Sequence, residues 1–104
     1  ARIVDRAGDG KAAWDKLQMA SYDCILLDIR MAGTDGQELF QWINASDPEL
    51  AAKIIFLTGD LANPSTRNFL DSLSNPVLEK PVSISELRRT MNTITEAHQG
   101  VISI

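Results

Sequence analysis

Two uninterrupted apolar runs constrain the fold of this chain more than any other feature of its sequence. Cys24–Leu27 and Ile54–Leu57 are apolar throughout and do not alternate with polar residues. Runs of this length and kind are typical of parallel strands that are buried on both faces of a sheet. Between them, Leu39, Phe40 and Ile43 recur at helical spacing and mark one apolar helix face. The sequence therefore predicts strands that alternate with helices.

Weaker versions of the same pattern extend over the rest of the chain. Extended runs are predicted at Arg2–Asp5 and Val77–Leu78, and helical stripes at residues 13–20, 69–73 and 84–94. Strands that alternate with helices favour a parallel sheet covered by helices on both faces. The predicted fold class is α/β, with a small doubly wound parallel sheet.

Polar residues ahead of three predicted helices indicate where those helices begin. Asp35 with Glu38, and Ser83 with Glu86, each have the spacing of a capping box. Asn63–Pro64 places a cap residue before a proline, which is tolerated at the first helical position. These signals predict helix starts near residues 36, 64 and 84.

Length and charge limit the functions open to the chain. Its 104 residues fit one domain, and ten Lys and Arg against fourteen Asp and Glu give a formal net charge of -4. An acidic chain without a basic run is poorly suited to nucleic acid or an anionic membrane surface. No apolar run has the length of a membrane span. The single cysteine, Cys24, excludes an internal disulfide and fits a cytoplasmic location.

Polar residues with complementary chemistry follow three of the predicted strands. Asp28 follows the second apolar run, Thr58 the third and Lys80 the fourth. Because ligands of open α/β sheets bind beyond the carboxyl ends of the strands, parallel neighbours would gather these side chains at one edge. A carboxylate can form an aspartyl-phosphate, and a hydroxyl and an ammonium can hold phosphoryl oxygens.

Each of these residues also has an ordinary explanation when it is taken alone. Asp28 could cap a loop, Thr58 is a common type of strand residue, and Lys80 would usually be solvated. Only the ordered set of three indicates phosphoryl chemistry.

The surroundings of this set resemble a known family, the receiver domains of two-component response regulators (CheY-like). Asp28–Gly36 reads Asp-Ile-Arg-Met-Ala-Gly-Thr-Asp-Gly and is similar to the phosphoacceptor loop of that family. Leu57–Asp60 resembles its hydroxyl-bearing strand end, and Glu79–Pro81 resembles its Lys-Pro signature. The resemblance covers about residues 2–97 and implies a flavodoxin-like doubly wound sheet. Thr-Gly-Asp followed by Leu-Glu-Lys-Pro is similar to receivers of hybrid sensor histidine kinases.

The resemblance implies a role for each site residue. Asp28 would accept a phosphoryl group from a histidine of a kinase or a histidine phosphotransfer domain, and Thr58 and Lys80 would bind the phosphoryl oxygens. Asp28 and the backbone carbonyl of Arg30 would ligate Mg²⁺. The Lys-Pro bond of the family is commonly cis, which Pro81 permits. Such a module is a phosphoprotein and not an enzyme, although its parent protein could be a hybrid histidine kinase tethered to a membrane.

Three further residues are predicted to modulate the site. Val77 stands where many members of the family carry an aromatic switch residue, so we expect a smaller rearrangement on phosphorylation. Pro81 orients the preceding lysine. Asp60 and Arg30 each lie two residues past a site residue, and we expect an ion pair between them that slows attack of water on the phosphoryl group. A receiver homodimer is an additional partner that the resemblance allows.

The main departure from the family lies at the N-terminus. Arg2–Asp5 matches the second strand of the family, so we expect its first strand and helix, about 20 residues, to be absent. The acidic pair that holds Mg²⁺ would be absent with them, which predicts weak metal binding. The expected domain is a receiver over residues 1–97, truncated at its N-terminus.

The absent strand is normally central, between the strands at Arg2–Asp5 and Cys24–Leu27. The first strand of this chain could move in to pair with Cys24–Leu27, another chain could supply a strand, or the segment could lie outside this sequence. Residues 98–104 are expected to be a C-terminal tail, a frayed end or the start of a neighbouring domain, although Val101–Ile104 is rich in residues that favour strands.

Two alternative functions remain at this point. A pseudo-receiver, which would bind partners without being phosphorylated, is favoured by the absence of the acidic pair. A phosphohydrolase of the haloacid-dehalogenase type would also use Asp, Thr and Lys at strand ends. That family needs a second Asp two residues after the nucleophile, where this chain has Arg30, which cannot exchange a proton at neutral pH.

Overall fold

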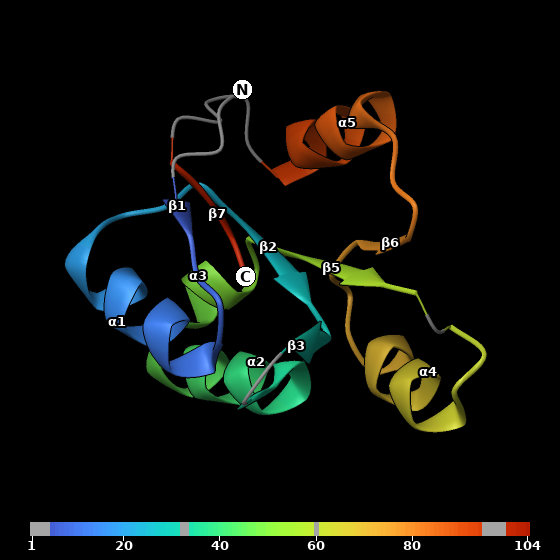
Figure 1. Cartoon of the computed structure of the whole chain (residues 1–104), viewed down its shortest axis with the longest axis horizontal. Coiled ribbons are helices and arrows are strands. Elements are labelled where there is room, and N and C mark those ends of the chain that lie inside the picture. Colours follow the sequence, from blue (N-terminus) through green and yellow to red (C-terminus); the bar gives the residue numbers. More distant parts are fainter. Residues whose placement is uncertain (1–4, 32–33, 60, 95–99) are drawn as a thin grey trace.

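Strands and helices alternate along the chain, as the sequence predicts. The computed structural model describes residues 5–31, 34–59, 61–94 and 100–104. In chain order the elements are β1 (Asp5–Arg6), α1 (Gly10–Met19), β2 (Cys24–Asp28), β3 (Arg30–Met31), β4 (Thr34–Asp35), α2 (Gly36–Ser46), α3 (Pro48–Ala51), β5 (Ile54–Thr58), α4 (Pro64–Asp71), β6 (Val77–Glu79), α5 (Ile84–Ile94) and β7 (Val101–Ser103) (Figure 1). Within these ranges, no helix is long and apolar enough to cross a membrane.

Five parallel strands form the main sheet, in the order β1-β7-β2-β5-β6. A separate two-stranded antiparallel hairpin, β3-β4, follows the end of β2. The order of the main sheet is the 2-1-3-4-5 order of flavodoxin-like doubly wound domains, with β7 in the place of the first strand. The predicted fold class is confirmed.

The C-terminal residues lie in the centre of the sheet, and the expectation of a frayed or separate tail is wrong. β7 pairs with β2 on one side, Val101 opposite Cys24, and with β1 on the other, Ile102 opposite Asp5. Val101 and Ile102 are fully buried. An empty position here would leave the facing edges of β1 and β2 unpaired inside the sheet, which is costly. The chain's own tail fills the position, so β1 does not move in to pair with β2.

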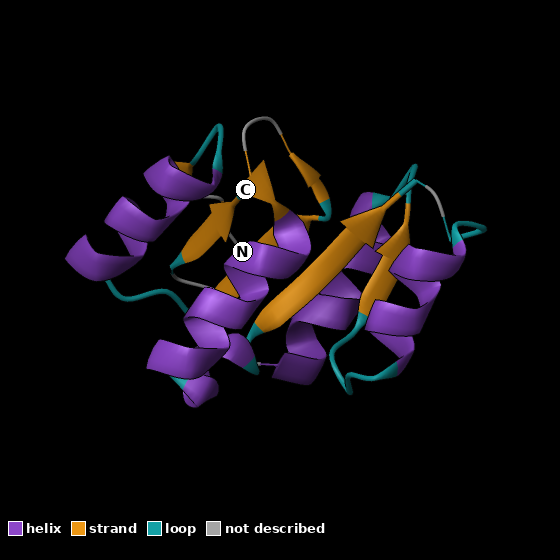
Figure 2. Ribbon diagram, turned by 90° about the horizontal axis from the view of Figure 1, so that it is seen from below, coloured by secondary structure: helices purple, strands orange, loops and turns teal. Residues whose placement is uncertain are grey.

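The connection that brings β7 to the centre follows the usual handedness of crossover connections. The steps from β2 to β5 to β6 run in one direction, and α2 and α4 contribute Leu39 and Leu70 to the apolar core on one face. The step from β6 to β7 runs back, and α5 contributes Met91 to the core on the other face. Because direction and face are both reversed, the hand is the same, as parallel sheets require. Figure 2 shows helices on both sides of the strands.

Each face of the sheet has its own apolar core. The larger core joins Phe56 of β5 to Phe40 of α2 and Phe69 of α4, whose ring centroids lie 5.4–5.8 Å apart. The smaller core lies under α5 and includes Cys24, Leu26, Ile55, Leu78, Met91 and Val101. β2 contributes to both, which agrees with its uninterrupted apolar sequence.

Side-chain caps begin several of the helices. Asn63 accepts hydrogen bonds from the backbone N–H groups of Ser65 and Thr66 at 2.9 and 3.2 Å, as predicted for α4. Ser83 accepts from the N–H of Glu86 at 3.1 Å ahead of α5. The side chain of Asp35, the predicted cap of α2, lies outside what the structure describes. Asp9 caps α1 and Asp47 caps the short α3, neither of which the sequence patterns had indicated.

Backbone hydrogen bonds of Gly100 connect the start of β7 to the start of β2. Its N–H donates to the carboxylate of Asp23 at 3.1 Å, and its carbonyl accepts from the N–H groups of Asp23 and Cys24 at 2.6 and 3.2 Å. A Cβ atom at this position would lie 2.8 Å from the carbonyl oxygen of Ser21 and 3.3 Å from Cα of Tyr22. The backbone of Gly100 approaches its neighbours more closely than any side chain allows.

Gly100→Ala is therefore expected to lower the free energy of unfolding by about 1–3 kcal/mol, because the added methyl overpacks a site bounded by backbone. Gly59→Ala is the matched control, since nothing lies within 4 Å of the Cβ it would add. Its stability should stay within about 0.5 kcal/mol of the parent. Urea unfolding of the three proteins measures the difference, and equal stability of both variants would contradict the position of β7.

Candidate functional site

The three residues predicted to act together meet at the carboxyl edge of the main sheet. Asp28 ends β2, Thr58 ends β5, and Lys80 follows β6. Asp28 lies opposite Leu57 of β5, and the N–H of Lys80 donates to the carbonyl of Thr58 at 2.8 Å. Neighbouring strands lie about 4.8 Å apart, so this register brings the three side chains to one place.

An ion pair joins two of these residues. The ammonium group of Lys80 contacts Oδ2 of Asp28. The Asp28 side chain is 25% exposed and that of Lys80 is 45% exposed, so the carboxylate is accessible from solvent. Ion pairs this exposed usually contribute about 1 kcal/mol or less to stability. The pair is therefore a minor contributor to the stability of the fold.

Thr58 completes the set from the strand between the other two. β5 lies between β2 and β6 in the sheet, and Thr58 is 3% exposed at its carboxyl end. Buried polar side chains are rare: among the described residues, only Thr58 and Thr66 are buried and polar. The buried position of Thr58 beside Asp28 and Lys80 agrees with a hydroxyl that serves the site.

The loop after Asp28 turns back tightly onto β2. Arg30 of β3 pairs with Asp35 of β4, and the N–H of Gly36 then donates to the carbonyl of Ile29 at 3.1 Å. A Cβ at Gly36 would lie 2.7 Å from both Cα and the carbonyl oxygen of Ile29. The glycine that ends the Asp28–Gly36 motif is required because α2 begins against the end of β2.

The predicted modulatory residues are only partly described. The Lys80–Pro81 bond is cis, as the resemblance implied. Val77 begins β6 opposite Phe56 and packs against the larger core. Asp60 and the side chain of Arg30 lie outside what the structure describes, so their ion pair stays a prediction.

Among the described residues, those at this edge do not make a complete Mg²⁺ site. Mg²⁺ needs six oxygen ligands in near-octahedral geometry. Asp28 offers one carboxylate and the backbone of Arg30 is a second candidate, but no group of three or more His, Cys, Asp or Glu in the described ranges could hold a metal ion. β7, which occupies the place beside β2, continues to Ile104 without an acidic side chain. The carboxylate of Asp9, in the turn after β1, is engaged in capping α1.

One contributor to the site was missed by the sequence patterns. The N–H of Asp28 donates to the carbonyl of Ile104 at 3.0 Å, so the end of the C-terminal strand lies against the predicted phosphoacceptor. The only signal in the sequence was the strand-favouring composition of Val101–Ile104, which does not name a pairing partner.

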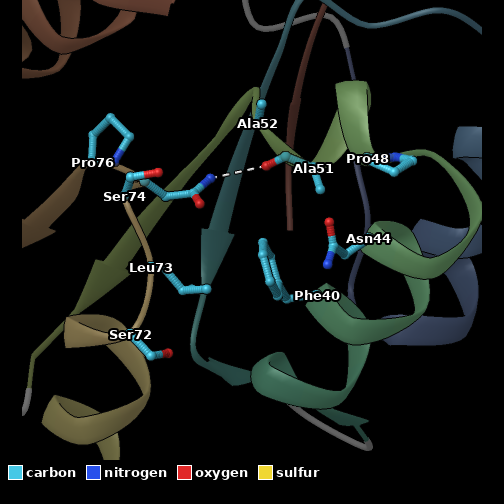
Figure 3. A pocket seen from close by; sticks show the side chains of 10 residues that line it. Phe40, Asn44, Pro48, Ala51, Ala52, Ser72, Leu73, Ser74 and Pro76 are labelled. Carbon is cyan, nitrogen blue, oxygen red and sulfur yellow. Dashed lines mark hydrogen bonds between the residues drawn. The ribbon is translucent and has the colours of Figure 1, made fainter.

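One pocket lies away from this edge. It has a volume of about 320 Å³ and is lined by residues of α2, α3 and the segment between α4 and β6, including Phe40, Asn44 and Pro76 (Figure 3). Asn75 also lines the pocket, and its side-chain amide donates to the carbonyls of Ala51 and Ile54 at 2.9 and 3.0 Å. The pocket begins where β5 begins, at the opposite end of the strand from Thr58.

These structural features agree with what comparison with known proteins shows. The family model described as "Response regulator receiver domain" matches residues 1–92. The chain therefore belongs to the response-regulator receiver family, a class of domain in two-component signalling.

Similar proteins include regulators and a sensor. The chain is 32% identical over 98 residues to "Probable methanogenesis regulatory protein FilR2" of Methanothrix harundinacea, a match that spans 88% of this chain and 63% of that protein. It is 29% identical over 85 residues to "Sensor protein GacS" of Pseudomonas syringae, across 79% of this chain and 9% of that protein. The chain thus spans less than two thirds of these relatives.

Solved structures give the same result. A receiver domain of a Francisella response regulator is 29% identical, with a TM-score of 0.69, over 85% of this chain and 71% of that one. The receiver domain of a sensor histidine kinase from Pseudomonas aeruginosa, which has magnesium coordinated in its active-site cleft, is also 29% identical, with a TM-score of 0.71, over 85% of this chain and 72% of that one.

Cys24 has no part in this chemistry, as expected for a buried strand residue. It is fully buried in β2. Burial, with the negative charge of Asp23 adding to it, raises the pKa of the Cys24 thiol to about 11. Since the thiolate is the reactive form, a raised pKa makes the thiol unreactive at every pH well below that value.

Cys24 should therefore resist a thiol-directed reagent such as iodoacetamide at pH 8 in the folded chain and react fully in urea. At pH 8 a thiol with this pKa is thiolate in about one molecule in a thousand. Mass spectrometry of the alkylated protein measures this. Labelling of the folded chain as fast as in urea would contradict the buried position of β2 beside β7.

Proposed function

We propose that Asp28 is the phosphoacceptor of this receiver domain and takes a phosphoryl group from a histidine of a kinase or phosphotransfer domain. The observation that supports this is the meeting of Asp28, Thr58 and Lys80 at one sheet edge, with the ammonium already paired to the carboxylate. The family supports the role in general, and the assignment to these residues is our proposal.

In the proposed reaction, a carboxylate oxygen of Asp28 attacks the phosphorus of the phosphohistidine. The phosphorus–nitrogen bond breaks, the histidine nitrogen leaves with the bonding electrons and takes a proton, and an acyl phosphate forms on Asp28. The product carries a charge of about -1.5 to -2. Lys80, which is already paired with the carboxylate, and Thr58 would then hold the phosphoryl oxygens.

The same chemistry suggests how phosphorylation of Asp28 would change the structure elsewhere in the domain. Lys80 and Thr58 belong to the ends of β6 and β5, so a shift of either toward the phosphoryl group would move those strands against α4 and α5. We propose that α4, β6 and α5 form the responding surface, with Val77, Asp60 and Pro81 as modulatory residues. The side chain of Val77 is smaller than the aromatic ring that many members of the family carry at this position, which predicts a modest rearrangement on phosphorylation.

The remaining parts of the proposal concern the setting of the domain. We propose a cytoplasmic phosphoprotein that catalyses no reaction on other substrates, within a larger protein that could be a hybrid histidine kinase or a response regulator. The proteins to which it is similar include both a sensor protein and a regulatory protein. A phosphohydrolase is disfavoured, because Arg30 occupies the place of the second acid and the chain belongs to the receiver family.

The phosphoacceptor is tested with a small phosphodonor such as acetyl phosphate in the presence of Mg²⁺. We expect one phosphoryl adduct by intact mass spectrometry, lost in Asp28→Ala and retained in Asp15→Ala, which removes an exposed carboxylate of α1. Lys80→Ala should slow the reaction by about tenfold or more, since a charge-assisted contact to the phosphoryl group is lost. An adduct that persists in Asp28→Ala would exclude the assignment, and no adduct on the parent would make this a pseudo-receiver.

Magnesium binding is expected to be weak in this chain. Because the described residues supply few oxygen ligands, we expect at least about tenfold weaker binding than in the Pseudomonas aeruginosa receiver, which serves as the positive control. Titration followed by NMR shifts of the Asp28 amide measures binding without any reaction. Saturation at the same Mg²⁺ concentration in both proteins would show that other residues complete the site.

A further inference from the structure

We infer that β7 is a positioning element of the phosphoacceptor site, and that it acts through the main chain of Ile104. This inference rests on the proposed role of Asp28 and adds a control point to it: whatever holds or withdraws the C-terminal strand would alter the reactivity of Asp28.

The main chain of Ile104 holds the end of β2 at two points. Its N–H donates to the carbonyl of Leu26 at 2.8 Å, and its carbonyl accepts from the N–H of Asp28 at 3.0 Å. On the other side of β2, the N–H of Ile29 donates to the carbonyl of Leu57 at 3.1 Å. The peptide groups before and after Asp28 are thus held by different strands, which fixes the direction in which its side chain leaves the backbone.

Ser103, the residue before Ile104, makes its backbone hydrogen bond toward β1, on the other side of β7 from β2. The carbonyl of Ser103 accepts from the N–H of Ala7 at 3.0 Å, beyond β1. In a strand, the backbone groups of successive residues face alternate neighbours, so Ile104 bonds to the strand of Asp28 and Ser103 to the strand on the far side. Ile104, which directly follows β7, therefore supports the site, and Ser103 at the end of β7 does not.

Apolar contacts set this register. Ile102 is fully buried and Ile104 is 8% exposed, both in the larger core, while Val101 is buried in the smaller one. A slip by one residue would turn each of these side chains to the wrong face. The register that places Ile104 against Asp28 is therefore favoured over its neighbours.

The support comes from residues that the family match does not include. The match ends at residue 92, before β7 begins at Val101. In this chain the strand beside the phosphoacceptor thus follows α5, and the tail and the site are directly linked. A change in the position of this segment would reach Asp28 through the hydrogen bonds of Ile104 to Asp28 and Leu26.

Two proline variants separate this role from a general effect on stability. Ile104→Pro removes the N–H that bonds to Leu26, and Ser103→Pro removes an N–H that faces β1. Each places one proline in the same central strand, so both should lower the free energy of unfolding by similar amounts. Ile104→Val keeps both backbone groups and controls for the loss of side-chain volume.

Amide hydrogen exchange followed by NMR gives the deciding readout. The quantity compared is the ratio of the Asp28 amide exchange rate to the Phe56 amide exchange rate in the same molecule. We expect this ratio to rise about tenfold in Ile104→Pro. It should be unchanged in Ser103→Pro and Ile104→Val. Phosphorylation per folded molecule should fall only in Ile104→Pro. Equal Asp28 exchange ratios in the two proline variants would overturn the inference.

A second measurement covers the case in which Ile104→Pro does not fold. In the parent chain, a scalar coupling across the hydrogen bond is expected between the Asp28 amide nitrogen and the Ile104 carbonyl carbon, and its absence would overturn the inference. Neither readout needs phosphorylation. If the parent accepts no phosphoryl group, the proposed function fails while the exchange and coupling data still decide the role of β7.

Discussion

The structure depends on the pairing of β7 between β1 and β2. β1 is only two residues long and, in the described ranges, pairs with β7 alone, so β7 joins it to the rest of the sheet. In a parallel sheet every central position must be filled, because unpaired N–H and C=O groups cannot be solvated there. The backbone contacts of Gly100 set where this strand starts, and its buried side chains set its register.

The pairing of β7 with β1 and β2 also determines the geometry of the carboxyl edge of the sheet. β7 holds one side of β2 and β5 the other, so Asp28 is presented at a fixed point, and the register of β5 with β6 brings Lys80 to it. The same arrangement determines which groups of the C-terminal strand lie beside Asp28. The segment that completes the sheet supplies a backbone hydrogen bond to Asp28 through Ile104, and the side chains of Val101–Ile104 include no carboxylate.

Most of the fold was predictable because its signals are local. β2 and β5 were evident from uninterrupted apolar runs, and the start of α4 from Asn63 and Pro64. Asp28, Thr58 and Lys80 could be grouped because parallel strands end at one edge and the motifs around them resemble a family. The four-residue α3 was missed because a helix of one turn has almost no periodicity. β7 was missed for a different reason: its partners lie some 75–100 positions away in the sequence, and nothing in Val101–Ile104 itself indicates that the centre of the sheet needs a strand.

The most direct test of this account is a set of backbone nuclear Overhauser effects measured in solution. The account predicts contacts from Val101 and Ile102 to Cys24 and Ile25 on one side, and from Ile102 and Ser103 to Asp5 and Arg6 on the other, within a monomer. Direct contacts between β1 and β2, with none from the C-terminal residues to either strand, would contradict it.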